Sequence, residues 1–356
     1  MNLDDFNAFN QLDPQNMLGE IDNLPAQLEK AWELGKRQSC EGFTPSQGFT
    51  SVLISGMGGS AIGADLLAAY VASSCPVPVI VQRDYGLPAW AHGPETLVIA
   101  SSHSGNTEET LEAFNAALQN KCTLMAVATG GILAERAAQA NIPLWKFEHP
   151  GQPRAAAGFS FGLLLAIFTR LGLIPNPGIE LAGAVAAMRK QQEPLRAAIP
   201  VAHNPAKRMA GQLVGRWVNV YASGCLAPVA RRWKTQLNEI AKAGAGFEVL
   251  PEADHNALAG LHNPEEVLSR TTTLFLRALS DHPRNYLRLD LTRQGFMVEG
   301  LNTDVYEAQG ESPLAHIWTT LHFGDYTAYY LAMAYGADPT PVEALENFKA
   351  AMQAAQ

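Results

Sequence analysis

Cysteine is scarce in this chain and is scattered along it. The 356 residues include four cysteines, and no two of them stand in a C-x-x-C spacing: Cys40, Cys75, Cys122 and Cys225. Such spacing favours neither a disulfide framework nor a cysteine zinc site. We therefore expect free thiols in a reducing cytosol.

Long hydrophobic runs are also missing. The longest, Ala155–Ala166, is interrupted by Gly and Ser and is followed by Arg170. Since a membrane-spanning helix needs about 20 apolar residues, this run predicts a buried helix instead. The first residues, MNLDDFNAFNQLDPQ, are polar and acidic without the apolar centre of a secretory signal. These features predict a cytoplasmic protein without a membrane partner.

Charge is limited to 17% of the residues, and 25 Lys and Arg stand against 34 Asp and Glu, a net charge of −9. Because nucleic acids and anionic membranes attract basic surfaces, both kinds of partner are disfavoured. An acidic protein that binds phosphate must use backbone N–H groups and a few placed side chains. Hydrophobic residues make up 47% of the chain, which allows a large core.

Apolar runs alternate with helical patterns in two series. Before the first series, residues 13–37 have helical spacing with a break expected at Pro25. In the first series we predict strands at 50–55, 77–82, 96–101, 123–129 and 143–147, and helices at 60–72, 107–119, 132–141 and after Pro153. A stretch with two prolines at 172–178 and a helix near 180–198 follow. In the second series we predict strands at 217–222, 247–250, 272–276, 296–298 and 303–306, and helices at 232–243 and 313–335, the last ending at Gly336.

Continuous apolar strands separated by helices indicate parallel sheets that are covered on both faces. The fold class expected is therefore α/β, with two doubly wound parallel-sheet domains and helical extensions at both ends. We expect an N-terminal extension over 1–40, a first domain over 41–175, a connecting helix over 176–200 and a second domain with a C-terminal helix over 201–356.

A glycine-rich turn follows the first strand. It reads Gly56-Met57-Gly58-Gly59-Ser60-Ala61 and leads into a helix. This matches the G-x-G-x-x-A pattern of dinucleotide-binding sites. That interpretation requires an acidic residue about 20 positions further on, and Asp84 lies farther than that, which disfavours it.

A second turn, after the third strand, is rich in hydroxyl groups. It reads Ser101-Ser102-His103-Ser104-Gly105-Asn106-Thr107 before the next helix. Hydroxyl groups and a helix N-terminus together can hold a phosphate dianion. No lysine follows the glycine, so this is not the loop of a P-loop nucleotidase. The alternative is that Thr107 only caps its own helix. Both turns lie at the carboxyl edge of one predicted sheet, where such folds bind ligands.

The two turns, GMGGSA and SSHSGNTEET, together resemble a sugar isomerase (SIS) domain of flavodoxin-like fold. This resemblance implies that phosphate is bound by six residues of the turns: Gly58, Gly59, Ser60, Ser102, Ser104 and Thr107. Four further segments resemble the bifunctional phosphoglucose/phosphomannose isomerase family: 153–156, 231–239, 251–256 and 338–349. One departure is Ile240, where that family has asparagine.

The resemblance also implies four catalytic roles. Glu239 would be the base that moves the proton between C2 and C1, and Arg154 would stabilise the enediolate. His255 would assist ring opening from the neighbouring subunit of a homodimer, and Lys349 would contact the ring oxygen or the enediolate. Without the resemblance, these would be a solvated helix glutamate, a surface arginine, a turn histidine and an exposed lysine.

The function expected is metal-independent interconversion of glucose 6-phosphate, and of mannose 6-phosphate, with fructose 6-phosphate through a cis-enediol. This is a reaction of glycolysis and gluconeogenesis, and no cofactor is expected. The other histidines show no H-x-x-x-H spacing, so a catalytic metal is disfavoured. Three alternatives are a sugar-phosphate sensor without chemistry, an aminosugar isomerase linked to a glutaminase domain, and a nicotinamide oxidoreductase. Thr340 is a small residue that would leave room for the enediol to rotate.

Overall fold

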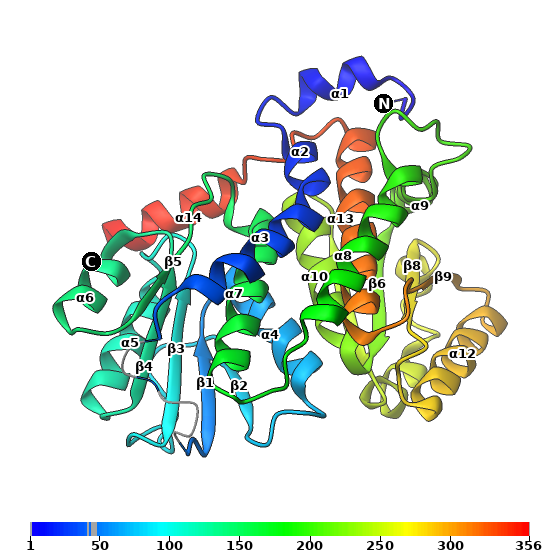
Figure 1. Ribbon diagram of the computed structural model, residues 1–356. Helices are drawn as coiled ribbons and strands as arrows, with labels where there is room; N and C mark the ends of the chain where they lie inside the picture. The colour runs from blue at the N-terminus through cyan, green and yellow to red at the C-terminus, as the bar shows by residue number, and fades with distance from the viewer. Residues whose placement is uncertain (1, 41–42, 44–47, 356) are drawn as a thin grey trace.

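Two parallel sheets lie side by side in the computed structural model, which describes residues 2–40, 43 and 48–355 (Figure 1). The first sheet has the order β2-β1-β3-β4-β5, formed by Ser51–Ser55 (β1), Val79–Gln82 (β2), Thr96–Ser102 (β3), Thr123–Ala128 (β4) and Leu144–Lys146 (β5). The second has the order β7-β6-β8-β9, formed by Trp217–Ser223 (β6), Ala245–Leu250 (β7), Thr271–Arg277 (β8) and Asn302–Glu307 (β9). The predicted α/β class with two parallel sheets is confirmed. The predicted boundary at residue 41 lies outside the described residues.

Helices cover both faces of the first sheet because both faces of its strands are apolar. Val52 and Ile54 of β1 pack with α4 and α7, while Leu53 packs with α5 and α6 on the other face. These helices are Gly58–Val71 (α4), Glu108–Gln119 (α5), Gly131–Gln139 (α6) and Ala157–Arg170 (α7). The predicted buried helix in the longest apolar run is α7, in which every residue from Ala157 to Phe168 is buried.

The second sheet is also covered on both faces. Val220 of β6 packs with helices α10 and α13, and Tyr221 with α12. The surrounding helices are Gly178–Gln192 (α8), Pro205–Leu213 (α9), Ala227–Glu239 (α10), Pro283–Val298 (α12) and Pro313–Tyr335 (α13). The strand predicted at 296–298 is wrong, because these residues end α12. The buried positions Leu289, Thr292 and Phe296 follow helical spacing.

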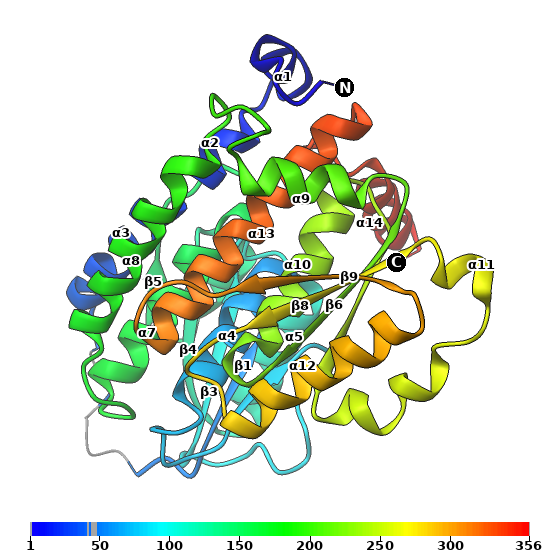
Figure 2. The same ribbon diagram turned by 90° about the vertical axis from the view of Figure 1, so that its right-hand side faces the viewer.

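Helix α13 lies between the two sheets and joins their cores (Figures 1 and 2). The helix has 23 residues, and every residue from Leu314 to Met333 is buried. One hydrophobic cluster runs through both halves of the chain. Inside this core Arg232 donates to Asp325 through Nε at 3.2 Å and Nη2 at 2.8 Å. The predicted end at Gly336 is confirmed, since that residue adopts a φ of 69°. Within the described ranges, no helix is long and apolar enough to cross a membrane.

The N-terminal segment forms three helices, Phe6–Leu12 (α1), Met17–Asp22 (α2) and Leu24–Arg37 (α3). The helix break falls at Asn23 rather than at Pro25, since proline is tolerated in the first turn of α3. Helix α3 packs on α7 of the first half. Helix α1, which was not predicted, contacts the second half, where the Phe9 ring lies 6.1 Å from the Tyr329 ring.

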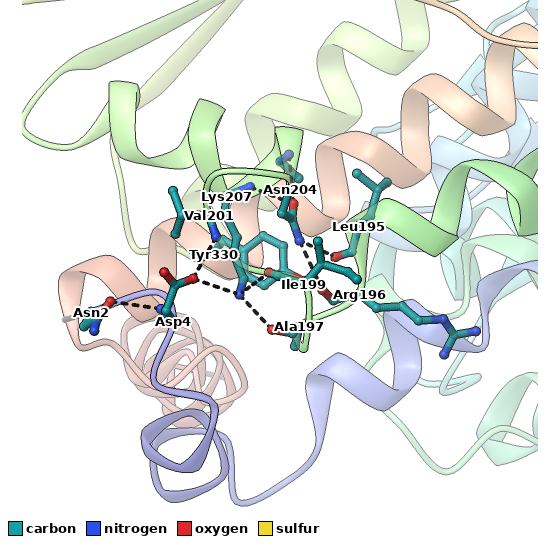
Figure 3. A network of polar contacts seen from close by, with 11 residues as sticks. Asn2, Asp4, Leu195, Arg196, Ala197, Ile199, Val201, Asn204, Lys207 and Tyr330 are labelled. Carbon is teal, nitrogen blue, oxygen red and sulfur yellow. Dashed lines mark hydrogen bonds and ion pairs between the residues drawn. The ribbon is translucent and has the colours of Figure 1, made fainter.

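A buried lysine fixes the N-terminus to the segment between α8 and α9 (Figure 3). Lys207 donates to the carbonyl oxygens of Ala197 at 2.7 Å and Ile199 at 2.9 Å, and its Nζ lies 3.9 Å from the Asp4 carboxylate. Burial lowers the pKa of Lys207, and Asp4 opposes that shift. The lysine therefore has a structural role.

Several predicted helices end earlier than expected, two of them by a full turn or more. The helix near 180–198 ends at Gln192 and continues as a 3-10 turn containing Pro194. Helix α10 ends at Glu239, three residues before Lys242, which has a φ of 56°. The chain also includes short helices at Glu265–Leu268 (α11) and, as 3-10 turns, Pro153–Ala155 (η1) and Glu252–His255 (η4). It finishes with Glu343–Ala354 (α14), on which Leu345 and Phe348 are exposed.

Candidate active site

The two predicted phosphate-binding turns lie next to each other at the carboxyl ends of β1 and β3. These strands are hydrogen-bonded neighbours, with Ser55 in register with Ala100. Strand β2 lies on one side of β1, and β3, β4 and β5 follow on the other side. The direction in which successive strands are added to the sheet therefore reverses at β1, between β1 and β3. Open α/β sheets bind their ligands at such a switch point.

The first turn is held against the second by Ser60. This serine is buried, and its Oγ accepts a hydrogen bond from the backbone N–H of His103 at 3.1 Å. Its own hydroxyl hydrogen is therefore still available to a ligand. Gly58 has a φ of +50°, which favours glycine. A Cβ on Gly59 would lie 2.3 Å from the carbonyl oxygen of Pro153, so only glycine lets this turn approach η1.

The second turn gathers its hydroxyl groups around Ser102. Buried Ser102 has its Oγ 2.9 Å from Oγ1 of Thr107, and the Oγ also accepts from the backbone N–H of Gly105 at 3.1 Å. Ser104 is exposed and accepts from the N–H of Asn106 at 3.2 Å. Thr107 is the N-cap residue of α5, yet in the described part of the chain no side chain caps that helix. The start of α5 therefore lacks a side-chain cap, while Glu108 and Glu109 of its first turn interact with the positive end of the helix dipole.

Gly105 makes the second turn compact. It has a φ of +72°, and a Cβ there would lie 1.9 Å from the carbonyl oxygen of Gly130 in the turn after β4. The Asn106 side chain reinforces this contact by accepting from the N–H of Ile132 at 3.0 Å. The turn after β4 therefore also holds the hydroxyl-bearing turn in place.

Arg154 and Glu239 meet beside the first turn. Arg154 belongs to η1, is buried, and places Nη1 3.8 Å from Oε2 of Glu239 at the end of α10. Its Nη2 donates to the carbonyl oxygens of Pro339, at 3.1 Å, and Thr340. The Glu239 side chain is 28% exposed. The pair therefore offers a partly accessible carboxylate next to a guanidinium with a fixed orientation.

Charged groups of both signs surround this pair. Burial lowers the pKa of Arg154, while Glu239 raises it and Arg232 lowers it further. Burial also lowers the pKa of Lys242, followed by repulsion from Arg154. The Lys242 Nζ donates to the carbonyl oxygen of Glu239 at 2.5 Å. Asp338 raises the pKa of both Arg154 and Lys242, so two cations and two carboxylates lie near one another at this point.

Three buried polar atoms near this pair have no hydrogen-bond partner among the described residues. They are Nε of Arg154, Oγ1 of Thr340 and Oε1 of Gln236, which precedes Glu239 by one helical turn. Most buried polar groups in proteins are paired, so unpaired ones mark groups that can bind a ligand or water. Gln236, Lys242 and Asp338 were missed from the sequence. The i, i+3 spacing of Gln236 and Glu239 on one helix was the available signal.

The structure brings together most of the predicted site residues but not all. Gly59 touches η1, and η1 carries Arg154 to Glu239, so both turns and this pair form one continuous region. His255 is exposed in η4, and Lys349 is exposed on α14. Across the described ranges, neither makes a hydrogen bond or ion pair with Arg154 or Glu239. The described residues also contain no group of three or more side chains suited to a metal ion.

Comparison with known proteins identifies the family. The model of the bacterial phospho-glucose isomerase C-terminal SIS domain matches residues 202–352. A bifunctional phosphoglucose/phosphomannose isomerase from Caldicellulosiruptor bescii is 39% identical over 336 residues, covering 94% of this chain and 98% of that protein. One from Aquifex aeolicus is 32% identical, covering 86% and 90%. A crystal structure of a hypothetical protein from Thermus thermophilus shares the fold, with a TM-score of 0.74, 16% identity and coverage of 98% and 94%.

These similarities agree with the resemblance seen in the two turns and in the segments around Arg154, Glu239 and His255. The chain belongs to the bifunctional phosphoglucose/phosphomannose isomerase family.

Proposed function

We propose that this sugar-phosphate isomerase interconverts glucose 6-phosphate and mannose 6-phosphate with fructose 6-phosphate through a cis-enediol. The observation that carries the proposal is the Arg154–Glu239 pair, at 3.8 Å, beside the hydroxyl-bearing turns. A carboxylate is suited to moving a proton between two carbons, and a guanidinium is suited to the negative charge that forms on the oxygens.

The phosphate group binds at the carboxyl edge of the first sheet. Ser60, Ser102, Ser104 and Thr107 supply hydroxyl donors, Gly58 and Gly59 allow close approach of the backbone, and the N-terminus of α5 supplies a favourable dipole. This set needs no lysine or arginine within the turns, which suits an acidic chain. Binding the phosphate here directs the other end of the sugar toward η1 and α10.

Glu239 then takes the proton from C2 of the aldose and returns it to C1. The resulting enediolate is stabilised by Arg154, whose Nη2 is fixed by the carbonyl oxygens of Pro339 and Thr340. The base and the guanidinium supply the acid–base and electrostatic parts of the reaction, so the proposal assigns no step to a metal ion or cofactor. We place the reaction in glycolysis and gluconeogenesis in the cytoplasm.

Ring opening requires a further acid and base. We propose that His255 serves this role from the second subunit of a homodimer, and that Lys349 moves toward the substrate with α14. Both side chains are exposed in the single chain. This exposure is expected of residues that reach the site of a neighbouring subunit once the subunits assemble. Glucose 6-phosphate and mannose 6-phosphate differ at C2, so one base serves both when the enediol rotates about C2–C3. Thr340, which is buried beside Arg154, is the small residue that we expect to allow this.

A sugar-phosphate sensor would need the same turns but not the Arg154–Glu239 pair. The test is to incubate EDTA-treated protein with fructose 6-phosphate and to separate the products by chromatography. Formation of both aldose phosphates supports the proposal. Glucose 6-phosphate alone would restrict it to one substrate pair. No turnover, together with a rise in melting temperature on adding fructose 6-phosphate, would replace it with the sensor.

A further inference from the structure

A chain of three titratable side chains ends in the second phosphate-binding turn. Nε2 of His103 lies 3.0 Å from Nδ1 of His149, and Nε2 of His149 lies 3.1 Å from Oε2 of Glu20. The three residues come from the turn after β3, from the segment after β5 and from helix α2. We call them the Glu20–His149–His103 relay. None of the catalytic roles proposed above uses them.

The carboxylate sets the direction of every hydrogen bond in the relay. Glu20 can only accept when ionised, so His149 donates to it through Nε2–H. In neutral His149 the remaining nitrogen, Nδ1, accepts from Nε2–H of His103. Neutral His103 therefore has an unprotonated Nδ1, which carries a lone pair and cannot donate to an anion.

Adding one proton to the two imidazoles changes that nitrogen into a donor. If the proton resides on His103, both of its ring nitrogens carry hydrogen. If it resides on His149, then His149 Nδ1–H donates to His103 Nε2, and His103 carries its hydrogen on Nδ1. Both arrangements give one positive charge and an N–H at Nδ1 of His103. This result does not depend on which ring holds the proton.

His103 carries this nitrogen within the turn itself. Nδ1 is the ring nitrogen nearer the backbone, and His103 stands between Ser102 and Ser104 in the chain. Among the residues that the structure describes, no protein group hydrogen-bonds this nitrogen. Residues 101–107 contain no lysine or arginine, so His103 is the group of the turn that can become positively charged.

Without a ligand, the surroundings keep His103 neutral. The His103 ring lies edge-on to Phe147 at 5.7 Å, and the His149 ring lies 5.9 Å from Phe159. Burial lowers the pKa of His103 to about 4, repulsion from His149 contributes, and Glu20 opposes the shift. A dianion bound in the turn raises the pKa of His103 because opposite charges favour the protonated form.

We propose that the Glu20–His149–His103 relay takes up a proton from solvent when a sugar phosphate binds, so that Nδ1 of His103 donates to the phosphate. This inference rests on the proposed function, since it assumes that the phosphate binds in this turn. It makes His103 a phosphate-binding residue, and His149 and Glu20 positioning residues. It also gives the N-terminal helix α2 a part in substrate binding.

Isothermal titration with glucitol 6-phosphate tests the relay, because this sugar phosphate has no carbonyl group and cannot be isomerised. Titrations at pH 7 in two buffers of different ionisation enthalpy give the number of protons taken up, after correction for the ligand's own ionisation near pH 6. We expect an uptake approaching one proton per chain. In His103→Gln the uptake disappears and the affinity falls about 10-fold, as for loss of one charged hydrogen bond.

Two further variants separate the relay from a general effect of substitution. Glu20→Gln keeps a hydrogen-bond acceptor for His149 but removes the negative charge, so the uptake falls while the melting temperature at pH 8 changes little. His203→Gln removes an exposed histidine outside the relay and leaves both uptake and affinity unchanged. If His103→Gln does not fold, Glu20→Gln alone decides between the outcomes.

Binding to the unsubstituted protein with no proton uptake overturns the inference, as does the same uptake in His103→Gln or Glu20→Gln. Turnover of fructose 6-phosphate by the same preparation tests the proposed function separately. Turnover without proton uptake on ligand binding rejects the relay and still supports the proposed isomerase function. Absence of both turnover and binding rejects both.

Discussion

Substitution of Gly59 by alanine tests the contact that joins the turns proposed to bind phosphate to the Arg154–Glu239 pair. The new Cβ would lie 2.3 Å from the carbonyl oxygen of Pro153 and 3.3 Å from the backbone nitrogen of Arg154. Side-chain carbons do not approach backbone atoms that closely, so η1 and the turn must separate by roughly 1 Å to restore ordinary van der Waals contact. Since η1 carries Arg154, its guanidinium moves relative to Glu239.

Two effects of different size should follow. Overpacking of a fixed backbone costs about 1–3 kcal/mol, so the free energy of unfolding falls by that amount. Displacement of a positioned group by nearly 1 Å lowers kcat/KM by about 10²-fold. The assay is a coupled measurement of glucose 6-phosphate formation from fructose 6-phosphate, with urea unfolding on the same preparation. Most of the kinetic loss should fall in kcat, because the hydroxyl groups proposed to bind phosphate remain in place.

Gly183→Ala is the matched control. Gly183 lies in helix α8 and is exposed, and no described atom lies within 4 Å of the position of an added Cβ. This variant should be equally active and up to about 1 kcal/mol more stable, since alanine favours helices. Gly59→Ala with unchanged kcat/KM would refute the reasoning, because the contact with η1 would then have no bearing on catalysis.

Three further predictions concern the core, α14 and pH. Asp325→Asn leaves the buried Arg232 guanidinium without its counter-charge and should lower the free energy of unfolding by about 3–5 kcal/mol in urea titration; a loss below about 1 kcal/mol would contradict this. Lys349→Met should lower kcat about 10²-fold at an unchanged melting temperature, because this side chain is exposed, and full activity would exclude Lys349 from the site. The pKa of His103 is about 4 in the folded state against an ordinary 6.5, so the unfolded state binds more protons between these values. Stability should therefore decline as pH falls from 6.5 toward 4, by on the order of 3 kcal/mol from this residue, and His103→Gln should remove that part of the decline.

Much of the fold could be predicted because burial on both faces leaves a strong pattern. Every residue of β1 is buried and its centre, Val52 to Ile54, is apolar, because alternate residues pack on opposite layers; this distinguishes such strands from half-exposed ones. The end of α13 at Gly336 was predictable because a left-handed cap favours glycine. The strand predicted at 296–298 failed because Phe296 and Val298 have strand propensity, while the buried spacing from Leu289 to Phe296 favours a helix.

The site was less accessible from the sequence than the fold. Ser60 and Ser102 could be selected because hydroxyl groups at strand ends have a direct chemical meaning. The contact between Arg154 and Glu239 joins the two halves of the chain and depends on how they pack, which no local pattern encodes. The same holds for the link from Glu20 to His149, since it crosses from the N-terminal helices to the end of the first sheet.

Proton exchange during turnover tests the central claim most directly. Fructose 6-phosphate is incubated with the protein in D₂O until equilibrium, and the glucose 6-phosphate is examined by proton NMR. A cis-enediol formed by Glu239 predicts that deuterium enters C2 over many turnovers, and that Glu239→Gln slows both exchange and turnover at least about 10³-fold. Equilibrium reached without deuterium at C2, or an active Glu239→Gln variant, would contradict the account.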